Sequence, residues 1–248
     1  MDTNRRIAVV AGVLFITATL ADVISRVALV QPILGAPVDL TKISANEDQV
    51  LLGAVLLLIG AAAASGIAIA LYPVLRKHDE GLALGAVAFR LIEGALYIGI
   101  VVCVLLLVTL SQESANAGAA LSSAYEVPVA LLMAARQSLG EVAVLVFGIG
   151  ALMYYWVFYK SRLVPRWLSA WGLVAIALVM ASGLLVILRL TEPMSTTQVV
   201  LALPIAVQEM AMAVWLIAKG FNPSAIAAES AGETSRWQTV APSTASAT

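Results

Sequence analysis

Six long apolar stretches constrain the fold of this chain more than any other feature of its sequence. A helix rises about 1.5 Å per residue, so a helix needs roughly 20 residues to cross the hydrocarbon core of a membrane. The stretches are too long for the strands of a membrane barrel, and a helix satisfies all its backbone polar groups internally. We therefore predict an all-α, polytopic transmembrane helix bundle with six spans, at residues 7–30, 50–75, 82–110, 127–159, 167–190 and 199–218.

The composition agrees with an integral membrane protein. Of the 248 residues, 61% are hydrophobic and only 12% are charged, whereas soluble domains carry about 25% charged residues. We predict one transmembrane domain over residues 1–221 and a disordered cytoplasmic tail over residues 222–248, because the tail is rich in Ser, Thr, Ala, Gly and Pro. The lipid bilayer is the partner that this composition indicates. The net charge of −1 indicates no nucleic-acid binding, and nothing in the sequence points to a particular protein partner.

Lysine and arginine residues are concentrated in alternate loops, which predicts the orientation of the spans. The opposite loops hold only Lys42 and, at the end of the fifth span, Arg189. We therefore expect both termini to face the cytoplasm. The first stretch also fits a signal peptide cleaved near Ala21, but we favour an uncleaved span because the apolar run continues past Asp22 to Val30. The basic residues of the predicted cytoplasmic side are Arg5, Arg6, Arg76, Lys77, Lys160, Arg162, Arg166 and Lys219.

Local patterns add three further expectations about the helices. The segment Ser44-Ala45-Asn46-Glu47 has the pattern of a capping box before the second span. The fourth span is overlong, and Ser138-Leu139-Gly140 is a place where it would break or kink. Aromatic residues near the predicted cytoplasmic boundary are expected to form an interfacial belt: Tyr154, Tyr155, Trp156, Tyr159, Trp167 and Trp215.

The rarity of several residue types excludes whole classes of membrane chemistry. The only histidine, His78, lies in a short loop, which excludes haem held by two histidines and proteases with a Ser-His pair. The four lysines lie in loops or at helix ends, which argues against a retinal Schiff base. No phosphate-binding glycine loop is present, and the single cysteine, Cys103, is expected to serve packing. We predict no cofactor and no metal.

Three charged residues are expected at one depth near the middle of the membrane. From the helix rise, Arg90 and Glu93 lie about 12 and 16 Å from the cytoplasmic end of their span, and Glu209 lies about 15 Å from the same side. A charge at that depth costs roughly 3 kcal/mol on insertion scales, so these residues should face inward and meet. Gln208 and Tyr97 are candidate neighbours, and together the five residues form the predicted central polar cluster.

A second set of charges is expected farther from the cytoplasmic side. Asp22 and Arg26 lie about 22 and 28 Å along the first span and form an i, i+4 pair. Arg136, Glu141 and Arg189 fall at similar heights. Long side chains at this level can extend to water without a buried partner. The residues of this outer charged layer therefore need ion pairs less than those of the central cluster do.

Three segments resemble a known family. The stretch "SRLVPRWLSAWGLV" at residues 161–174 follows "FGIGALMYYWVFYK", and it resembles the signature of bacterial membrane proteins grouped as domain of unknown function 4386. The segments "AFRLIEGAL" at 88–96 and "LPIAVQEMAMAVWLIAKGF" at 203–221 are similar to two more parts of that family. The resemblance runs from about Arg5 to Pro223. It implies a multi-helix protein of a bacterial plasma (inner) membrane and carries no established activity or catalytic residue.

The sequence leaves four interpretations of the central cluster open. It is a structural ion pair, or it supports transport of a small solute coupled to protons. Alternatively, the protein is an accessory or sensor subunit, or an enzyme acting on a lipid, although no paired carboxylate motif favours the enzyme. Intramembrane ionisable groups favour a functional hypothesis because they are costly. Transport predicts a wet cavity reaching the cluster, an enzyme predicts a lateral opening beside the carboxylates, and an accessory protein predicts a sealed cluster.

Overall fold

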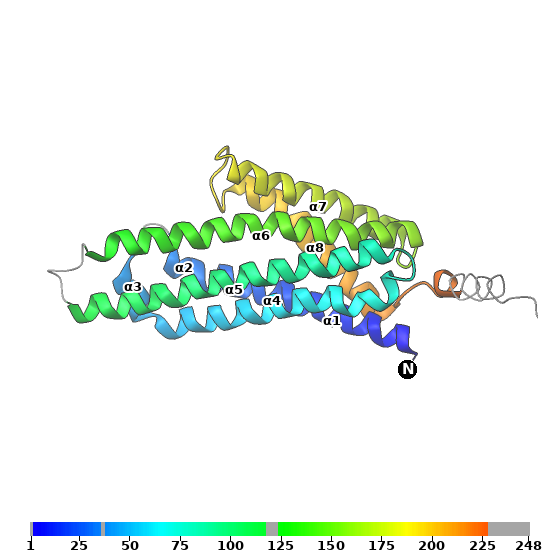
Figure 1. The fold of residues 1–248 in the computed structure, drawn as a ribbon, viewed down its shortest axis with the longest axis horizontal. Helices are drawn as coiled ribbons and strands as arrows, with labels where there is room; N and C mark the ends of the chain where they lie inside the picture. Colours follow the sequence, from blue (N-terminus) through cyan, green and yellow to red (C-terminus); the bar gives the residue numbers. More distant parts are fainter. Residues whose placement is uncertain (1, 36–37, 118–123, 228–248) are drawn as a thin grey trace, which may run out of the picture.

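The computed structural model describes residues 2–35, 38–117 and 124–227, which form helices joined by short turns (Figure 1). Among these residues six helical segments are long and apolar enough to cross a membrane, the first being Thr3–Leu34. The prediction of an all-α bundle with six candidate spans is therefore confirmed. The elements are α1 (Thr3–Val23), the π-helical segment η1 (Ile24–Val30), α2 (Gln31–Leu34), α3 (Leu40–Ala45), α4 (Glu47–Leu75), α5 (Glu80–Ala117), α6 (Glu126–Ser161), α7 (Arg166–Ile187) and α8 (Thr196–Ala218).

The six long helices form a closed ring. Each of α4, α5, α6 and α7 packs against the long helix before it and the long helix after it, and α8 closes the ring by packing on α1. Helices α5 and α6 extend well beyond the turn between α7 and α8 (Figure 1). With 38 residues, α5 is about 57 Å long, whereas α7, with 22 residues, is about 33 Å long. Helix α6, with 36 residues, is likewise much longer than a membrane requires.

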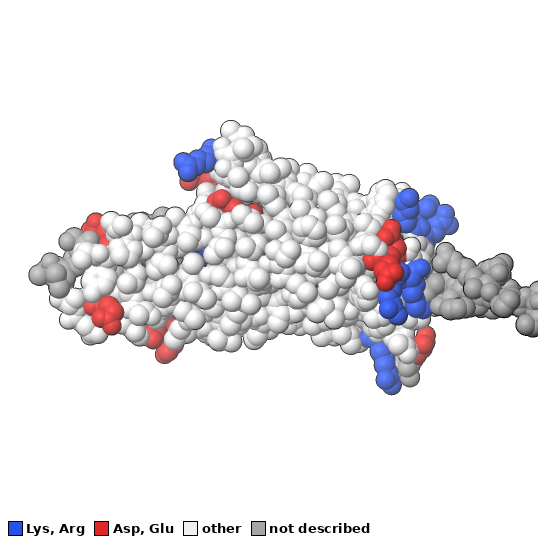
Figure 2. Space-filling model, in the orientation of Figure 1, with Lys and Arg blue, Asp and Glu red and all other residues white. Residues whose placement is uncertain are grey.

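Charged residues gather at the two ends of the bundle and leave a broad band free of them between (Figure 2). Lysine and arginine are concentrated at the end where the chain begins (Figures 1 and 2), which we call the basic end. The opposite end, on whose side the α7–α8 turn lies, is the far end. Large apolar side chains are exposed around the helices, among them Val10, Leu52 and Val102. An apolar surface of this extent is typical of a protein that faces lipid.

Two apolar cores fill the ring at different levels. Toward the basic end the core contains the aromatic residues Phe15, Tyr154, Tyr155 and Phe158, all of them fully buried. A second core, toward the far end, is built from aliphatic residues such as Leu57, Val104 and Leu107. The two buried charged residues of α5, Arg90 and Glu93, lie between the two cores along the chain. The bundle is therefore closed toward the basic end by a layer of packed aromatic rings.

The predicted aromatic belt is wrong for two of its members. Tyr154 and Tyr155 are 0% exposed because they share the inward face of α6 with Phe158, which follows them by three and four residues. Trp156 and Trp167 are 45% and 59% exposed and point outward. Sequence position near a membrane boundary does not distinguish the two faces of a helix, and the ring buries one of them.

Of two further local expectations, the capping box is wrong, and the fourth span has no break at residues 138–140. Helix α6 runs without interruption through Ser138–Gly140, and the irregular segment is instead η1 in the first span. The capping box before the second span is not formed, because Ser44 lies inside α3 and donates to the Thr41 carbonyl at 3.1 Å. The cap in this region is Asp39, which accepts from the Thr41 backbone N–H at 2.8 Å. Hydrogen bonds from Thr41 hold the pKa of the Asp39 carboxyl below its usual value.

The predicted tail lies largely outside the described residues, since residues 228–248 are not among them. Its first residues pack back onto the basic end. The Asn222 backbone N–H donates to the Leu163 carbonyl at 2.8 Å, and Ile226 contacts the aromatic core.

Candidate functional site

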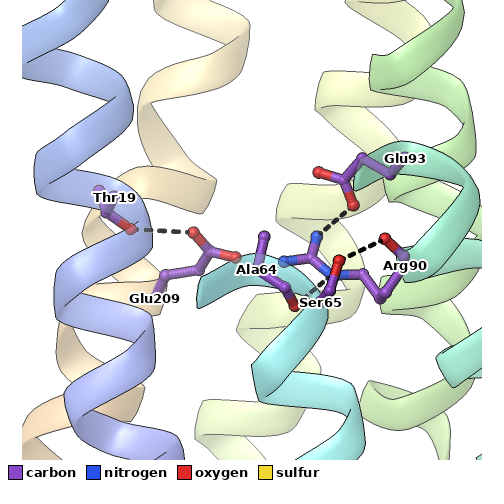
Figure 3. A network of polar contacts seen from close by, with 6 residues as sticks. All are labelled: Thr19, Ala64, Ser65, Arg90, Glu93 and Glu209. Atoms are coloured by element: carbon purple, nitrogen blue, oxygen red, sulfur yellow. Dashed lines mark hydrogen bonds and ion pairs between the residues drawn. The ribbon is translucent and has the colours of Figure 1, made fainter. Parts of the chain in front are cut away.

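A buried ion pair on α5 forms the centre of the site (Figure 3). Arg90 Nη1 lies 2.8 Å from Glu93 Oε2, and the two side chains are 3% and 5% exposed. The guanidinium also donates from Nε to the Ala64 carbonyl of α4 at 3.2 Å. Its central carbon lies 5.0 Å from the centre of the Phe147 ring on α6. Arg90 thus joins three neighbouring helices of the ring.

Small residues on α4 and α5 make this arrangement possible. Ser65 donates its hydroxyl to the Arg90 carbonyl at 3.2 Å, directly beside the Ala64 carbonyl that Arg90 binds. A Cβ atom on Gly94 would lie 2.7 Å from Ser65 Oγ, so a larger residue there would push the two helices apart. The small residues of the second span therefore do more than allow close packing, because they bring a backbone carbonyl within reach of the buried arginine.

Arg90 and Glu93 are held together as an ion pair rather than by a well-aligned hydrogen bond. Arg90 Nη1 and Glu93 Oε2 are at ion-pair distance, but neither atom has a hydrogen-bond partner of good geometry among the described residues. The Tyr154 hydroxyl, also buried, has none either. Arg90, Glu93 and Tyr154 interact electrostatically. Because buried polar groups are normally satisfied, the Tyr154 hydroxyl is the group of this layer that an added water molecule would satisfy.

Glu209 approaches the same layer from α8. Its carboxylate points toward α4 and α5 (Figure 3) and accepts a hydrogen bond from the Thr19 hydroxyl of α1 at 3.3 Å. It interacts electrostatically with Arg90 and Glu93. Glu209 is half-buried, whereas Arg90 and Glu93 are 2% and 4% exposed. The three charges of the predicted cluster thus share one layer, and among the described residues the close ion pair between them is the one within α5.

The two polar neighbours proposed for this cluster lie on opposite sides of it. Gln208 accepts from the Tyr155 hydroxyl at 2.5 Å and donates to the Leu168 carbonyl at 3.1 Å, so it belongs to the aromatic core. The Tyr97 ring instead lies 5.3 Å below the Arg26 guanidinium. The helical step from Glu93 to Tyr97 moves one turn toward the far end, which explains the difference.

The outer charged layer is organised by the π-helical segment. Arg26 Nε lies 2.7 Å from Asp22 Oδ1, and Asp22 also interacts with Glu93 and Glu209. The neighbouring Ser25 donates to the Gly53 carbonyl at 2.7 Å, which fixes η1 against α4. π-helical turns occur often at functional sites. Here the turn directs Arg26 into the interior of the ring.

A cavity of about 320 Å³ opens inside the ring toward the far end. Arg136 and Glu141 line it from α6, and Arg26 lines it from η1. Arg189 does not line it and lies exposed in the turn after α7, with a left-handed φ of 57°. All six long helical segments contribute to the wall. Its polar residues are Ser25, Arg26, Gln31, Arg136, Gln137, Glu141, Glu192 and Gln198.

The Asp22–Arg26 pair connects the cavity with the central cluster. Arg90, Glu93 and Glu209 are not among the residues that line the cavity. Arg26 lines it and is paired with Asp22, and Asp22 interacts electrostatically with both carboxylates of the cluster. The charged groups therefore form a series from the cavity to the middle of the bundle. No group of three or more His, Cys, Asp or Glu side chains placed to hold a metal occurs in the described part of the chain.

Comparisons with known proteins identify a family and nothing closer. A family model described as Domain of unknown function (DUF4386) matches residues 10–220. No curated protein and no solved structure matches the chain.

Proposed function

We propose, from the premise that this chain belongs to the family described as Domain of unknown function (DUF4386), that it is a small-solute carrier coupled to protons. The observation that carries the proposal is that the cavity lies next to the buried charged residues. A cavity lined by all six long helical segments leads toward a layer of buried charged residues, beside which the Tyr154 hydroxyl has no hydrogen-bond partner among the described residues. We further propose that the protein lies in a bacterial inner membrane with the basic end in the cytoplasm, because lysine and arginine gather at that end (Figure 2).

The charges suggest how solute and proton would be coupled. The solute enters the cavity at the far end and meets Arg26, whose charge is balanced by Asp22. Binding there changes the balance of charge around Asp22, Glu93 and Glu209, which interact electrostatically. One carboxylate then gains or loses a proton. The aromatic core keeps the path closed toward the basic end, so passage requires the packing of Tyr154 and Phe158 to open.

A second candidate is an accessory or sensor subunit. The observation that favours it is the burial of Arg90 and Glu93, which do not line the cavity. In this case the pair fixes α5 against α4, and the cavity binds a ligand without carrying it through. No contact in the described residues favours the lipid-modifying enzyme that the sequence also left open.

Transport is tested with the purified protein in liposomes that contain a trapped pH-sensitive dye. Small organic anions, amines and neutral sugars are added outside under a pH gradient. If the protein is a carrier, one of these classes of solute causes protons to move across the membrane, and this movement is lost in Glu209→Gln. The matched control is Glu113→Gln, an exposed glutamate near the end of α5. If no class moves protons faster than liposomes without protein, the carrier proposal is wrong and the accessory role is favoured.

A further inference from the structure

We infer that the cavity is a binding site for a small molecule that combines an anionic group with an apolar part. The site is built around Arg136, and its anionic ligand is a carboxylate, sulfonate or phosphate. This deepens the proposed function by naming the chemical class of the solute. It rests on that proposal only for movement across the membrane, since binding requires the cavity alone.

Arg136 is the residue that points to an anion. Its Nε atom is buried and has no hydrogen-bond partner among the described residues, although the side chain lines the cavity. An arginine presents several donors in a planar fork that matches carboxylate, sulfonate and phosphate groups. A buried guanidinium donor without a partner is costly, so an anionic acceptor at this position relieves a cost that the empty site carries.

A second arginine faces the same space. Arg26 also lines the cavity and lies close enough to Arg136 for their charges to repel each other. Asp22 is bound to Arg26, but Arg136 has no ion pair with a carboxylate among the described residues. An anion between the two arginines would remove their repulsion.

The acidic residues of the wall leave this position free. Glu141 accepts a hydrogen bond from the Gln137 side chain at 2.9 Å, and Glu192 is exposed in the α7–α8 turn. Neither forms a close ion pair with the Arg136 guanidinium among the described residues.

The rest of the wall is apolar and explains the second part of the ligand. Leu57, Ile100, Val104, Met133 and Val186 line the cavity, and they would surround a ring or a short hydrocarbon chain. The volume of about 320 Å³ is at the small end of the range for small-molecule sites, which is roughly 300–1,000 Å³. A molecule about the size of one aromatic ring with one anionic substituent suits such a space.

Binding is measured on the purified full chain in detergent, with benzenesulfonate as the probe and neutral benzenesulfonamide as its matched analogue. We expect benzenesulfonate to raise the unfolding temperature and the sulfonamide to have a much smaller effect. Arg136→Gln should weaken benzenesulfonate binding at least about tenfold. Arg189→Gln removes the same charge from an exposed turn outside the cavity and should leave binding unchanged. Equal binding of the two probes, or equal losses in the two variants, overturns the inference.

A second variant, which fills the cavity, keeps the test valid if Arg136→Gln fails to fold. Gly140 lines the cavity, and a Cβ there would meet nothing nearer than 4.0 Å. Gly140→Leu should therefore fold, fill the space and abolish binding of benzenesulfonate. Unchanged binding in Gly140→Leu shows that the probe binds elsewhere and overturns the site.

The anionic group can come from a free solute or from a lipid headgroup, and a second arm separates them. The protein is placed in nanodiscs of phosphatidylcholine with or without phosphatidylglycerol, and retained lipid is measured. Retention of phosphatidylglycerol that depends on Arg136, without benzenesulfonate binding, assigns the site to a lipid. If Arg136→Gln loses neither phosphatidylglycerol retention nor benzenesulfonate binding, the inference is overturned.

The binding site and transport can fail independently. Benzenesulfonate binding without proton movement in liposomes contradicts only transport. Proton movement that is unchanged in Arg136→Gln contradicts only this site.

Discussion

At the scale of single residues, the ion pair within α5 is the close contact between charged groups at the centre of the site. Arg90 and Glu93 are almost fully buried and 2.8 Å apart. Removing one partner of a buried pair typically costs about 3–5 kcal/mol, because the other charge is left uncompensated. The pair is therefore a better target for mutation than any exposed charge of the protein.

Arg90→Met should lower the free energy of unfolding by about 3–5 kcal/mol. Adding Glu93→Leu should recover most of this loss, and adding Glu209→Gln should recover less, because Glu93 lies at ion-pair distance from Arg90 and Glu209 does not in the described part of the chain. The measurement is a double-mutant cycle on thermal unfolding in detergent. Arg189→Met, at an exposed arginine, is the control and should change stability by about 0.5 kcal/mol or less. Strict additivity of Arg90→Met and Glu93→Leu would show that the pair contributes no coupling.

The sequence predicted which charges lie together in the middle of the bundle, but not the groups that surround them. Helix rise alone located Arg90, Glu93 and Glu209 at one depth, because charge and length are visible in the sequence. The Ala64 carbonyl and the Tyr154 hydroxyl were missed, since a backbone acceptor and the inward face of an aromatic helix depend on which helices are neighbours. The spacing of Ala151, Tyr154 and Phe158 on α6 was the available signal for the second of these, because i, i+3 and i+4 positions share one face.

At the scale of elements, close contacts between helices depend on glycines at particular positions. A Cβ on Gly172 of α7 would lie 2.5 Å from Tyr155 Cε1 of α6, and Tyr155 donates a hydrogen bond to Gln208 of α8. This glycine therefore controls the packing of three helices of the ring. Gly140 of α6 has no comparable neighbour, because a Cβ there would meet nothing nearer than 4.0 Å.

Gly172→Ala should lower stability by about 1–3 kcal/mol, because the added methyl group displaces the Tyr155 ring and strains the packed core. Gly140→Ala, the same substitution at an open helical position, should raise stability by up to about 1 kcal/mol. Both values come from thermal unfolding of the purified variants. Equal effects of the two substitutions would mean that the α6–α7 contact is not as tight as described.

Hydropathy predicts some of the helix boundaries and misses others. Apolar length predicted the fourth span closely, at 127–159 against Glu126–Ser161 in α6. It did not predict η1, because a π-helical turn leaves no mark in hydropathy. Nor did it predict that α5 continues to Ala117, since its last turns are polar and extend beyond the apolar run.

At the scale of the whole molecule, the ring of six helices has two different ends. The basic end is closed by packed aromatic residues and the far end contains the cavity. The orientation that we propose places the cavity on the side of the membrane away from the cytoplasm.

Cysteine labelling in intact cells tests this orientation. Single cysteines at Lys42 and Ser195, at the far end, should react with a membrane-impermeant maleimide. Cysteines at Lys77 and Ser161, at the basic end, should react only after the cells are opened. Cys103 is buried, and a Cys103→Ser background provides the control for unspecific reaction. Labelling of Lys77→Cys in intact cells would invert the proposed topology.

We propose that the buried pair serves transport rather than stability, and one double variant separates these two roles. Arg90→Met combined with Glu93→Leu replaces the pair by apolar residues, and such replacements are often neutral or stabilising. Its unfolding temperature in detergent and its solute-driven proton movement in liposomes are measured on the same preparation. We predict stability within about 1 kcal/mol of the native protein and loss of proton movement. Lowered stability with proton movement retained would contradict the claim and show that the pair is structural.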